Sequence, residues 1–205
     1  MATRISIQVS AMRKQPRQAR SRATAASMLD AAAHILAERG FAGFTTNAVA
    51  ERAGASIGSL YQYFPNKYAL IEAVRRRHFD EVLAALRAAQ DSKLPRARRI
   101  AAFADGMIAV HERFPALHRV LLEQAPHDQG ADEAHRRFER AYGKACQAFF
   151  EANARRTAGG GAVPATVLAA AVAGVVHDAA SRGLLAAPGL RQELVVLIDA
   201  YLRRH

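Results

Sequence analysis

Apolar positions recur along most of the chain at the spacing of amphipathic helices. Between residues 21 and 39 an apolar face repeats every three to four residues, and Gly40 ends the pattern. This face contains Met28, Leu29, Ala32, Ile35 and Leu36. Two shorter patterns follow within residues 45–66, and a longer one begins after Pro65-Asn66. We find no alternating pattern of useful length, so the sequence predicts an all-α protein.

The second half of the chain predicts five further helices. Pro95 suits the first turn of one, and Pro115 ends that helix and opens a short one that runs through Leu122. The others are expected over residues 134–156, 164–185 and 190–202. Polar residues 124–133 and the glycine-rich residues 157–161 predict loops. The whole pattern amounts to nine helices.

Residues 45–70, TTNAVAERAGASIGSLYQYFPNKYAL, predict two short helices joined by a tight turn. Thr45 or Thr46 can cap the first helix and Ser56 the second, because a hydroxyl oxygen accepts from first-turn amides. Gly54 between them suits the left-handed backbone conformation of a turn. The pattern is that of a helix-turn-helix, whose second helix enters the major groove of DNA.

The run AGASIGSLYQYFPNK at residues 53–67 resembles the signature of the TetR family of bacterial regulators. The preceding residues 31–46 resemble the first helix and entry turn of that family, and the specific resemblance covers roughly residues 20–75. Ala55 and Tyr68 depart slightly from the family pattern. The resemblance implies a two-domain homodimer, with a DNA-binding domain at residues 20–66 and an effector-binding and dimerisation domain at residues 67–205. It further implies a repressor that an effector releases from a palindromic operator in double-stranded DNA.

The resemblance also assigns DNA-contacting residues. Phosphate contacts are expected from Thr46, Tyr61, Tyr63 and Lys67, and base or groove contacts from Ser56, Ile57, Gly58, Ser59 and Gln62. Gln62 can form two hydrogen bonds with adenine, and the methyl groups of Ile57 can meet that of thymine. For the two tyrosines, packing inside the motif remains the alternative.

The charge of the chain, +11 with an isoelectric point near 10.8, fits a nucleic-acid partner. Residues 1–80 hold twelve Lys and Arg against five Asp and Glu, whereas residues 81–205 hold seventeen against thirteen. The excess therefore concentrates around the helix-turn-helix. Residues 1–19 form a basic arm that either follows the DNA or is a disordered tail. Arginine-rich usage in a GC-rich genome explains much of the remaining excess.

The reactive side chains suggest neither a cofactor nor a metal. Cys146 is the one cysteine, which excludes a disulfide framework, fits a reducing cytoplasm and indicates an inert packing thiol. Among the eight histidines, no pair has the helical spacing with a flanking carboxylate that a metallohydrolase helix uses. His111 and His118 are instead candidates for hydrogen bonds inside a ligand pocket.

Aromatic and other apolar residues of the second half are candidates for an effector site: Phe103, Met107, Phe114, Phe138, Tyr142 and Phe149. Taken singly, each is equally an ordinary core residue. The resemblance to the TetR family implies a pocket here, which with His111 and His118 would hold an unidentified small molecule. The scarcity of carboxylates favours an apolar or anionic compound.

Within the apolar run from residue 162 to 176, residues 167–176 are apolar all round, which predicts a helix that needs a cover on two sides. We expect a second copy of the chain to supply one cover, with Val172, Val176, Leu194 and Ile198 in the dimer interface. The run is expected to be too short to span a bilayer. Since the N-terminus lacks a signal-peptide pattern, we expect a cytoplasmic protein without a membrane partner.

Two other classes of function remain open. A weakly specific architectural DNA-binding protein fits the high isoelectric point but leaves the large second half without a role. A helical enzyme lacks support, because we find no nucleophile–base–orienter set, phosphate loop or metal-ligand spacing. The sequence therefore favours a non-enzymatic, ligand-responsive transcriptional regulator.

Overall fold

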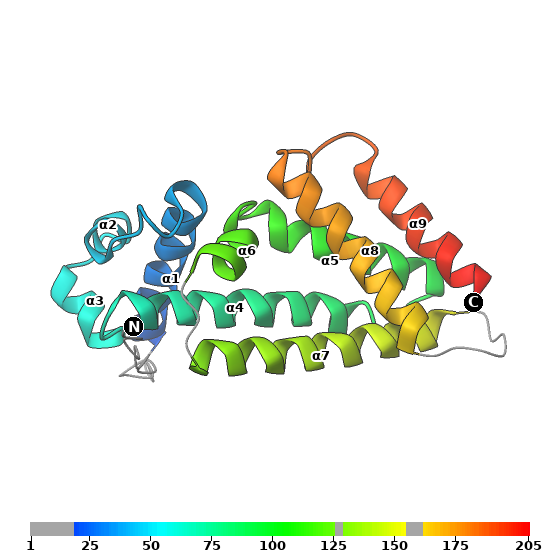
Figure 1. The fold of residues 1–205 in the computed structure, drawn as a ribbon, viewed down its shortest axis with the longest axis horizontal. Coiled ribbons are helices and arrows are strands. Elements are labelled where there is room, and N and C mark those ends of the chain that lie inside the picture. Colours follow the sequence, from blue (N-terminus) through cyan, green and yellow to red (C-terminus); the bar gives the residue numbers. More distant parts are fainter. Residues whose placement is uncertain (1–18, 126–128, 155–161) are drawn as a thin grey trace, which may run out of the picture. The chain divides into compact units, whose positions relative to one another are not determined.

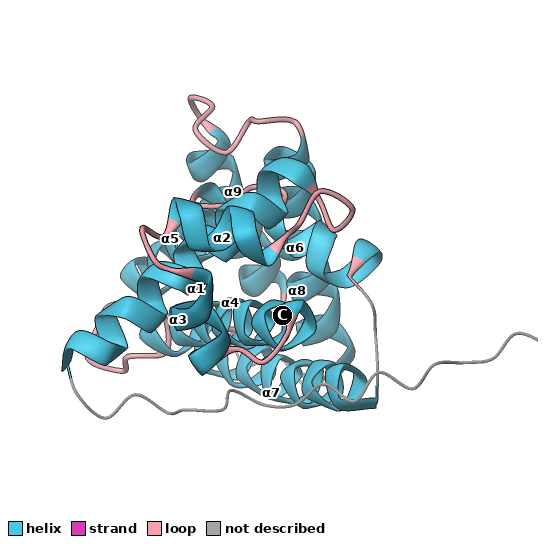
Figure 2. Ribbon diagram, turned by 90° about the vertical axis from the view of Figure 1, so that its left-hand side faces the viewer, coloured by secondary structure: helices cyan, strands magenta, loops and turns pink. Residues whose placement is uncertain are grey.

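A computed structural model describes residues 19–125, 129–154 and 162–205. These residues form nine α-helices and one π-helical segment and contain no strand (Figures 1 and 2), which confirms the predicted all-α fold. The helices are α1 (Ala19–Arg39), α2 (Thr46–Arg52), α3 (Ile57–Tyr63), α4 (Lys67–Ala88), α5 (Arg96–Glu112), α6 (Leu117–Arg119), η1 (Val120–Gln124), α7 (Gln129–Asn153), α8 (Ala162–Ser181) and α9 (Leu190–Arg204).

Most helix boundaries follow the sequence pattern, with local differences. The predicted loop at residues 124–133 was wrong in its second part, because α7 already begins at Gln129. Pro95 is the N-cap residue of α5 rather than part of its first turn, and the short helix after Pro115 changes to π-helical hydrogen bonding at Val120. Almost all of the predicted basic arm and of the glycine-rich loop lies outside the described residues.

The chain divides by its contacts into two compact units. The first consists of Met1–Arg77 and Ala116–His135, and the second of His78–Pro115 and Arg136–His205. Helix α4 therefore starts in the first unit and ends in the second. The first unit also includes α6 and η1, which the sequence analysis assigns to the second domain. The predicted domain boundary after residue 66 remains a prediction.

The first unit contains the packed helices α1, α2 and α3 of the helix-turn-helix region. Helix α2 packs on both α1 and α3. The buried side chains that hold the three together include Met28, Leu36, Val49, Leu60 and Phe64, each at most 1% exposed. Burying a side chain of this size contributes about 1.5–3 kcal/mol, so the motif has its own apolar core.

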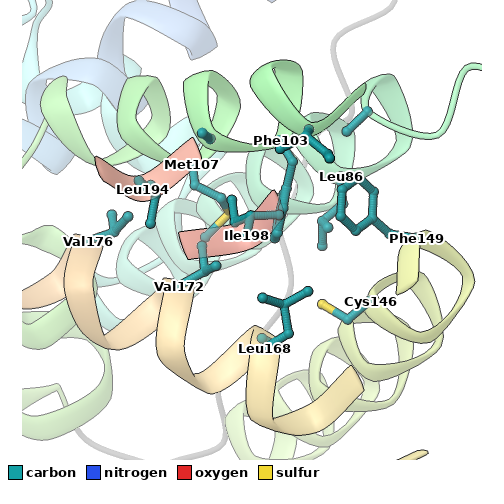
Figure 3. Close-up of a cluster of buried hydrophobic side chains, with 14 of the residues drawn as sticks. Leu86, Phe103, Met107, Cys146, Phe149, Leu168, Val172, Val176, Leu194 and Ile198 are labelled. Carbon is teal, nitrogen blue, oxygen red and sulfur yellow. The ribbon is translucent and has the colours of Figure 1, made fainter. Parts of the chain in front are cut away.

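The second unit is a helical core in which α5, α8 and α9 all contact one another. Phe103 and Met107 of α5 point toward Leu168 and Val172 of α8 in Figure 3, and all four are at most 3% exposed. Gly106 lets α5 approach α4 closely, because a Cβ atom there would lie 2.8 Å from that of Ala85. A side chain larger than hydrogen at position 106 would therefore push the two helices apart.

The residues predicted to form the dimer interface belong to this core instead. Val172, Val176 and Ile198 are 0% exposed and Leu194 is 2% exposed, and Figure 3 shows them in the buried cluster. That assignment was wrong, because both faces of α8 and α9 carry aliphatic side chains and these four point into the core of their own chain. The outward faces carry other apolar residues: Val163, Val167, Val196 and Leu197.

The expected exclusion of a membrane span by length was also wrong. Helix α8 has twenty residues and is long and apolar enough, by length and composition alone, to cross a membrane. Only 28% of its most apolar stretch is buried within the chain, so much of its apolar surface lacks a cover in a single copy. Its inward face nevertheless packs against α5 and α9, as in the core of a globular unit.

Candidate nucleic-acid interface and effector region

The predicted caps and turn of the helix-turn-helix are present. Thr45 Oγ1 accepts a hydrogen bond from the Ala48 amide at 3.2 Å, and Ser56 Oγ accepts one from the Ser59 amide at 3.1 Å. Gly54 has a φ of +64°, which a side chain would strain. Each short helix is therefore fixed at its start by its own sequence, and α3 is held at a defined angle to α2.

Helix α3 has one buried and one exposed face. Leu60 is fully buried, whereas Ile57 is 37% and Tyr61 42% exposed, and Gly58 and Gln62 are exposed as well. An exposed isoleucine and tyrosine on a seven-residue helix leave apolar surface in contact with water. The face offers methyl, hydroxyl and amide groups, which are the groups that read base edges.

The predicted phosphate-binding hydroxyls differ in how accessible they are. Thr46 Oγ1 and Tyr61 Oη lie 3.1 Å apart and share a hydrogen bond, which joins the start of α2 to the exposed face of α3. Tyr63 is only 8% exposed and packs inside the motif, so at most a small part of it can meet a phosphate. Burial therefore favours the packing role for Tyr63.

Lys67 stands at the first residue of α4 with its ammonium group over aromatic rings. Its Nζ atom lies 4.4 Å from the ring centroid of Phe41 and 5.5 Å from that of Tyr68. Cation–π attraction restrains the long side chain. Asn66 Oδ1 accepts from the Ala69 amide at 2.9 Å and fixes the start of the helix. The sequence analysis did not identify Phe41, because its contact with Lys67 joins residues from different elements.

The candidate effector residues mostly gather in the second unit. Phe103 and Phe149 have ring centroids 4.7 Å apart, and Phe138 stacks on Phe79 at 4.0 Å. Phe103, Met107, His111 and Phe149 are at most 2% exposed, Phe114 is 8% exposed, and Phe138 and Tyr142 are partly buried against the same core. His118 lies on α6 in the first unit and is half-buried.

Tyr142 is the polar exception among these apolar side chains. Its hydroxyl group is buried and has no hydrogen-bond partner with good geometry among the described residues. Burial, together with the nearby Cys146 thiol, raises the pKa of Tyr142 well above its ordinary value. Burial also raises the pKa of Cys146 to about 11, so this thiol stays protonated and unreactive at neutral pH.

Comparison with known sequences assigns the family. Residues 28–74 match the profile "Bacterial regulatory proteins, tetR family", and residues 95–202 match the profile "Tetracyclin repressor-like, C-terminal domain". The chain belongs to the TetR family of transcriptional regulators. The two matches together cover both the helix-turn-helix and the helical second half.

Two curated relatives come from Mycolicibacterium smegmatis. The chain is 29% identical over 96 residues to the HTH-type transcriptional activator FasR. This alignment covers 47% of this chain and 44% of FasR. It is 38% identical over 55 residues to the HTH-type transcriptional repressor KstR, and this alignment covers 27% of each protein. The chain thus matches less than half the length of these relatives, one an activator and one a repressor.

Solved structures share the fold. A transcriptional regulator from Rhodococcus sp. Rha1 aligns with a TM-score of 0.68 at 23% identity over 87% of this chain and 95% of that one. The fatty acid degradation regulator FadR from Bacillus halodurans aligns with a TM-score of 0.71 at 12% identity, over 92% and 96%. FadR from Bacillus subtilis in complex with stearoyl-CoA aligns with 0.65 at 12% identity, over 86% and 97%. At these identities the alignments establish the fold alone.

Proposed function

We propose that this regulator is a repressor that binds a roughly palindromic operator as a homodimer and leaves it when a small-molecule effector binds. The observation that carries the proposal is the exposed face of α3, which combines Ile57, Gly58, Tyr61 and Gln62 around the buried anchor Leu60. A recognition helix needs this division, since one face must be fixed in the domain while the other enters the groove.

The proposed contacts divide into those that position the protein and those that read sequence. Thr46, Tyr61 and Lys67 offer two hydroxyl groups and an ammonium group for phosphates, while Tyr63 supports them from the core. The proposed groove contacts come from the start and the exposed face of α3: Ser56, Ile57, Gly58, Ser59 and Gln62. Ser56 and Ser59 already hydrogen-bond one another at 2.9 Å, so they act as a pair.

We propose that the dimer forms through the outward faces of α8 and α9. Val163 is 73% exposed, Val167 and Val196 are each 48% exposed, and Leu197 is 37% exposed. Removing such side chains from water contributes roughly 25 cal/mol per Å², and a second copy supplies an apolar cover of the same kind. Two recognition helices then read two half-sites, which suits a motif with a helix as short as α3.

The proposed effector is an apolar or amphipathic small molecule that binds in the second unit near Tyr142. The buried Tyr142 hydroxyl has only the weakly hydrogen-bonding Cys146 thiol beside it, and a polar group of the effector would give it a stronger partner. Phe138, whose ring centroid lies 5.6 Å from that of Tyr142, and Phe79, which stacks on Phe138, suit an apolar body. Stearoyl-CoA is a reasonable first probe because the similar fold of Bacillus subtilis FadR was solved in complex with it.

The effector proposal is tested by linkage. If stearoyl-CoA weakens operator binding by some factor, operator DNA must weaken stearoyl-CoA binding by the same factor. Filling the region with Met107→Trp should abolish the response and leave DNA affinity nearly unchanged, provided that the core tolerates the bulk. A panel of apolar ligands that bind tightly without changing operator affinity would overturn the regulatory role.

We infer a cytoplasmic, non-enzymatic protein, since its proposed partner is chromosomal DNA and its one cysteine is held as a buried thiol. The architectural alternative is distinguished by the ratio of the affinity for a specific DNA site to the affinity for random DNA. A repressor should bind DNA from beside its own gene at least about a thousandfold more tightly than random DNA at physiological salt. A ratio near one would favour the architectural function instead.

A further inference from the structure

Two pairwise ring contacts, both made by His111, link three histidines from three helices of the second unit. His78 of α4 and His111 of α5 are 3% and 1% exposed, and His177 of α8 is half-buried. The rings of His78 and His111 meet edge to face with centroids 5.5 Å apart, and those of His111 and His177 lie 4.9 Å apart. Nothing in the DNA-binding account uses this cluster.

The hydrogen bonds around His111 fix which ring nitrogen carries its proton. Its Nδ1 atom lies 2.8 Å from the carbonyl oxygen of Met107, which can only accept, so Nδ1 must donate. The Nε2 atom of neutral His111 therefore carries a lone pair, and it lies 3.1 Å from Nε2 of His177. The two rings share one proton in this contact, donated by His177.

The two rings face one another through their Nε2 atoms, which places one lone pair and one proton between them. To present a second lone pair there, His177 needs only to move its ring proton from Nε2 to Nδ1, which turns the Nε2 lone pair toward His111.

We propose that His111 and His177, with His78 as a third ligand, form a binding site for a transition-metal ion of the Zn²⁺ class. Two nitrogens bound tetrahedrally at about 2.0–2.1 Å from zinc are roughly 3.3 Å apart, so the pair at 3.1 Å needs a shift of only a few tenths of an ångström. A ring nitrogen of His78 lies within 4.8 Å of one of His111.

The surroundings match those of metal-binding histidines. A ligating imidazole usually donates its second N–H to a carbonyl or carboxylate, which fixes its orientation, and the Met107 carbonyl does this for His111. Neutral imidazoles suit Zn²⁺, Co²⁺, Ni²⁺ or Cu²⁺ rather than the oxygen-preferring Mg²⁺ and Ca²⁺. Three protein ligands leave a fourth position for water or a ligand atom. Because the three helices supply one histidine each, a bound ion would join α4, α5 and α8.

The sequence could not indicate this site, since its ligands are far apart along the chain. His111 and His177 are separated by 66 residues. The search for ligands at i and i+4 on one helix therefore led to the expectation of no metal. The site shares His111 with the candidate effector residues, but it rests on the contacts of His111 with His78 and His177 and not on Tyr142.

Titration of the tag-free full chain with Co²⁺ tests the proposal. We expect one ion per chain with the visible d–d absorption of tetrahedral cobalt, displaced by Zn²⁺. His177→Gln should weaken binding at least tenfold, because even outer-shell changes cost 10–100-fold. His34→Gln, at a half-exposed histidine of α1, is the matched control and should bind as the wild type does.

Two further measurements keep the test decisive. His78→Gln should also weaken Co²⁺ binding, and an unchanged affinity would overturn the three-histidine site. Because His111→Gln risks misfolding, we replace this variant with imidazole ¹⁵N spectra of the wild type. Addition of Zn²⁺ should shift the Nε2 signals of His111 and His177. The proton on Nδ1 of His111 should stay in place. Absence of the cobalt band, or equal binding by His177→Gln, would show that the pair is an internal hydrogen bond only.

Discussion

The Nη2 group of Arg75 donates a hydrogen bond to the backbone carbonyl oxygen of Leu121 at 3.1 Å, deep inside the first unit. Arg75 is 1% exposed, and its Nη1 group also donates to Glu72 at 2.7 Å. Leu121 belongs to the π-helical segment η1, within the part of the chain that matches the C-terminal profile. Helix α4 is thus tied to a segment far along the chain, through an arginine that the sequence analysis did not identify.

Replacing Arg75 by methionine should lower the free energy of unfolding by about 3 kcal/mol. The change removes one member of a buried ion pair and leaves the Leu121 carbonyl unpaired. Arg76→Met is the control: Arg76 also pairs with Glu72, at 2.9 Å, but its side chain is 54% exposed, so we expect a loss below about 1 kcal/mol. Urea unfolding measures the free energy of unfolding of both variants. Equal losses would contradict the claim that the buried Arg75 contributes more than the exposed Arg76.

Lys67→Ala should weaken binding to every DNA sequence and lower the salt slope by about one unit, since it removes one phosphate contact. The wild-type ammonium group is held over Phe41, so little freedom is lost when it meets a phosphate. Lys144 is exposed on α7 and serves as the control. Fluorescence anisotropy at several salt concentrations gives the slope, and a slope shared by both variants would exclude Lys67 from the interface.

Aspartate substitutions on the two faces of α8 should have different effects, one on dimerisation and the other on folding. Val167→Asp, on the outward face at 48% exposure, should give a folded monomer. Val172→Asp, at 0% exposure, should instead unfold the second unit, because it buries an unpaired charge. Sedimentation velocity and circular dichroism distinguish the two results. A wild type that sediments as a monomer at micromolar concentration would refute the proposed homodimer.

Stability should decrease as the pH falls from about 6.5 toward 4. His177 has its pKa lowered from 6.5 to about 4 by burial and by His111, whose pKa burial also lowers. Between these values the unfolded chain binds more protons than the folded chain, so acid favours unfolding. Thermal unfolding of metal-free protein should therefore show a weaker pH dependence in His177→Gln than in the wild type. His34→Gln should keep the wild-type dependence, and a flat wild-type profile would be evidence against a neutral buried pair.

Local rules were sufficient to predict the helix-turn-helix. The caps Thr45 and Ser56 and the turn residue Gly54 depend on neighbours within a few residues, and the structure confirms all three. The family followed from the same short segment, and both profile matches confirm it. Interactions that depend on one element at a time can be read directly from sequence.

Interactions between distant elements could not be predicted in this way. On the nearly all-apolar α8, periodicity does not distinguish the inward Val172 from the outward Val167, and the dimer residues were chosen on the wrong face. The ties from Arg75 to Leu121 and from His111 to His177 join residues 46 and 66 positions apart. No spacing rule covers such pairs, because only the packing of helices brings them together.

Selection of binding sites from a randomised DNA duplex, by the wild type and by Gln62→Ala, tests the central claim most directly. For the wild type we expect an inverted repeat that binds one dimer. Gln62→Ala should lose preference at one base pair of each half-site, at a cost of about 1–3 kcal/mol if the contact is bidentate. Gln147→Ala, an exposed glutamine of α7, should select the wild-type sequence. Failure of the wild type to enrich any sequence, or an identical profile for Gln62→Ala, would contradict the reading of DNA by the exposed face of α3.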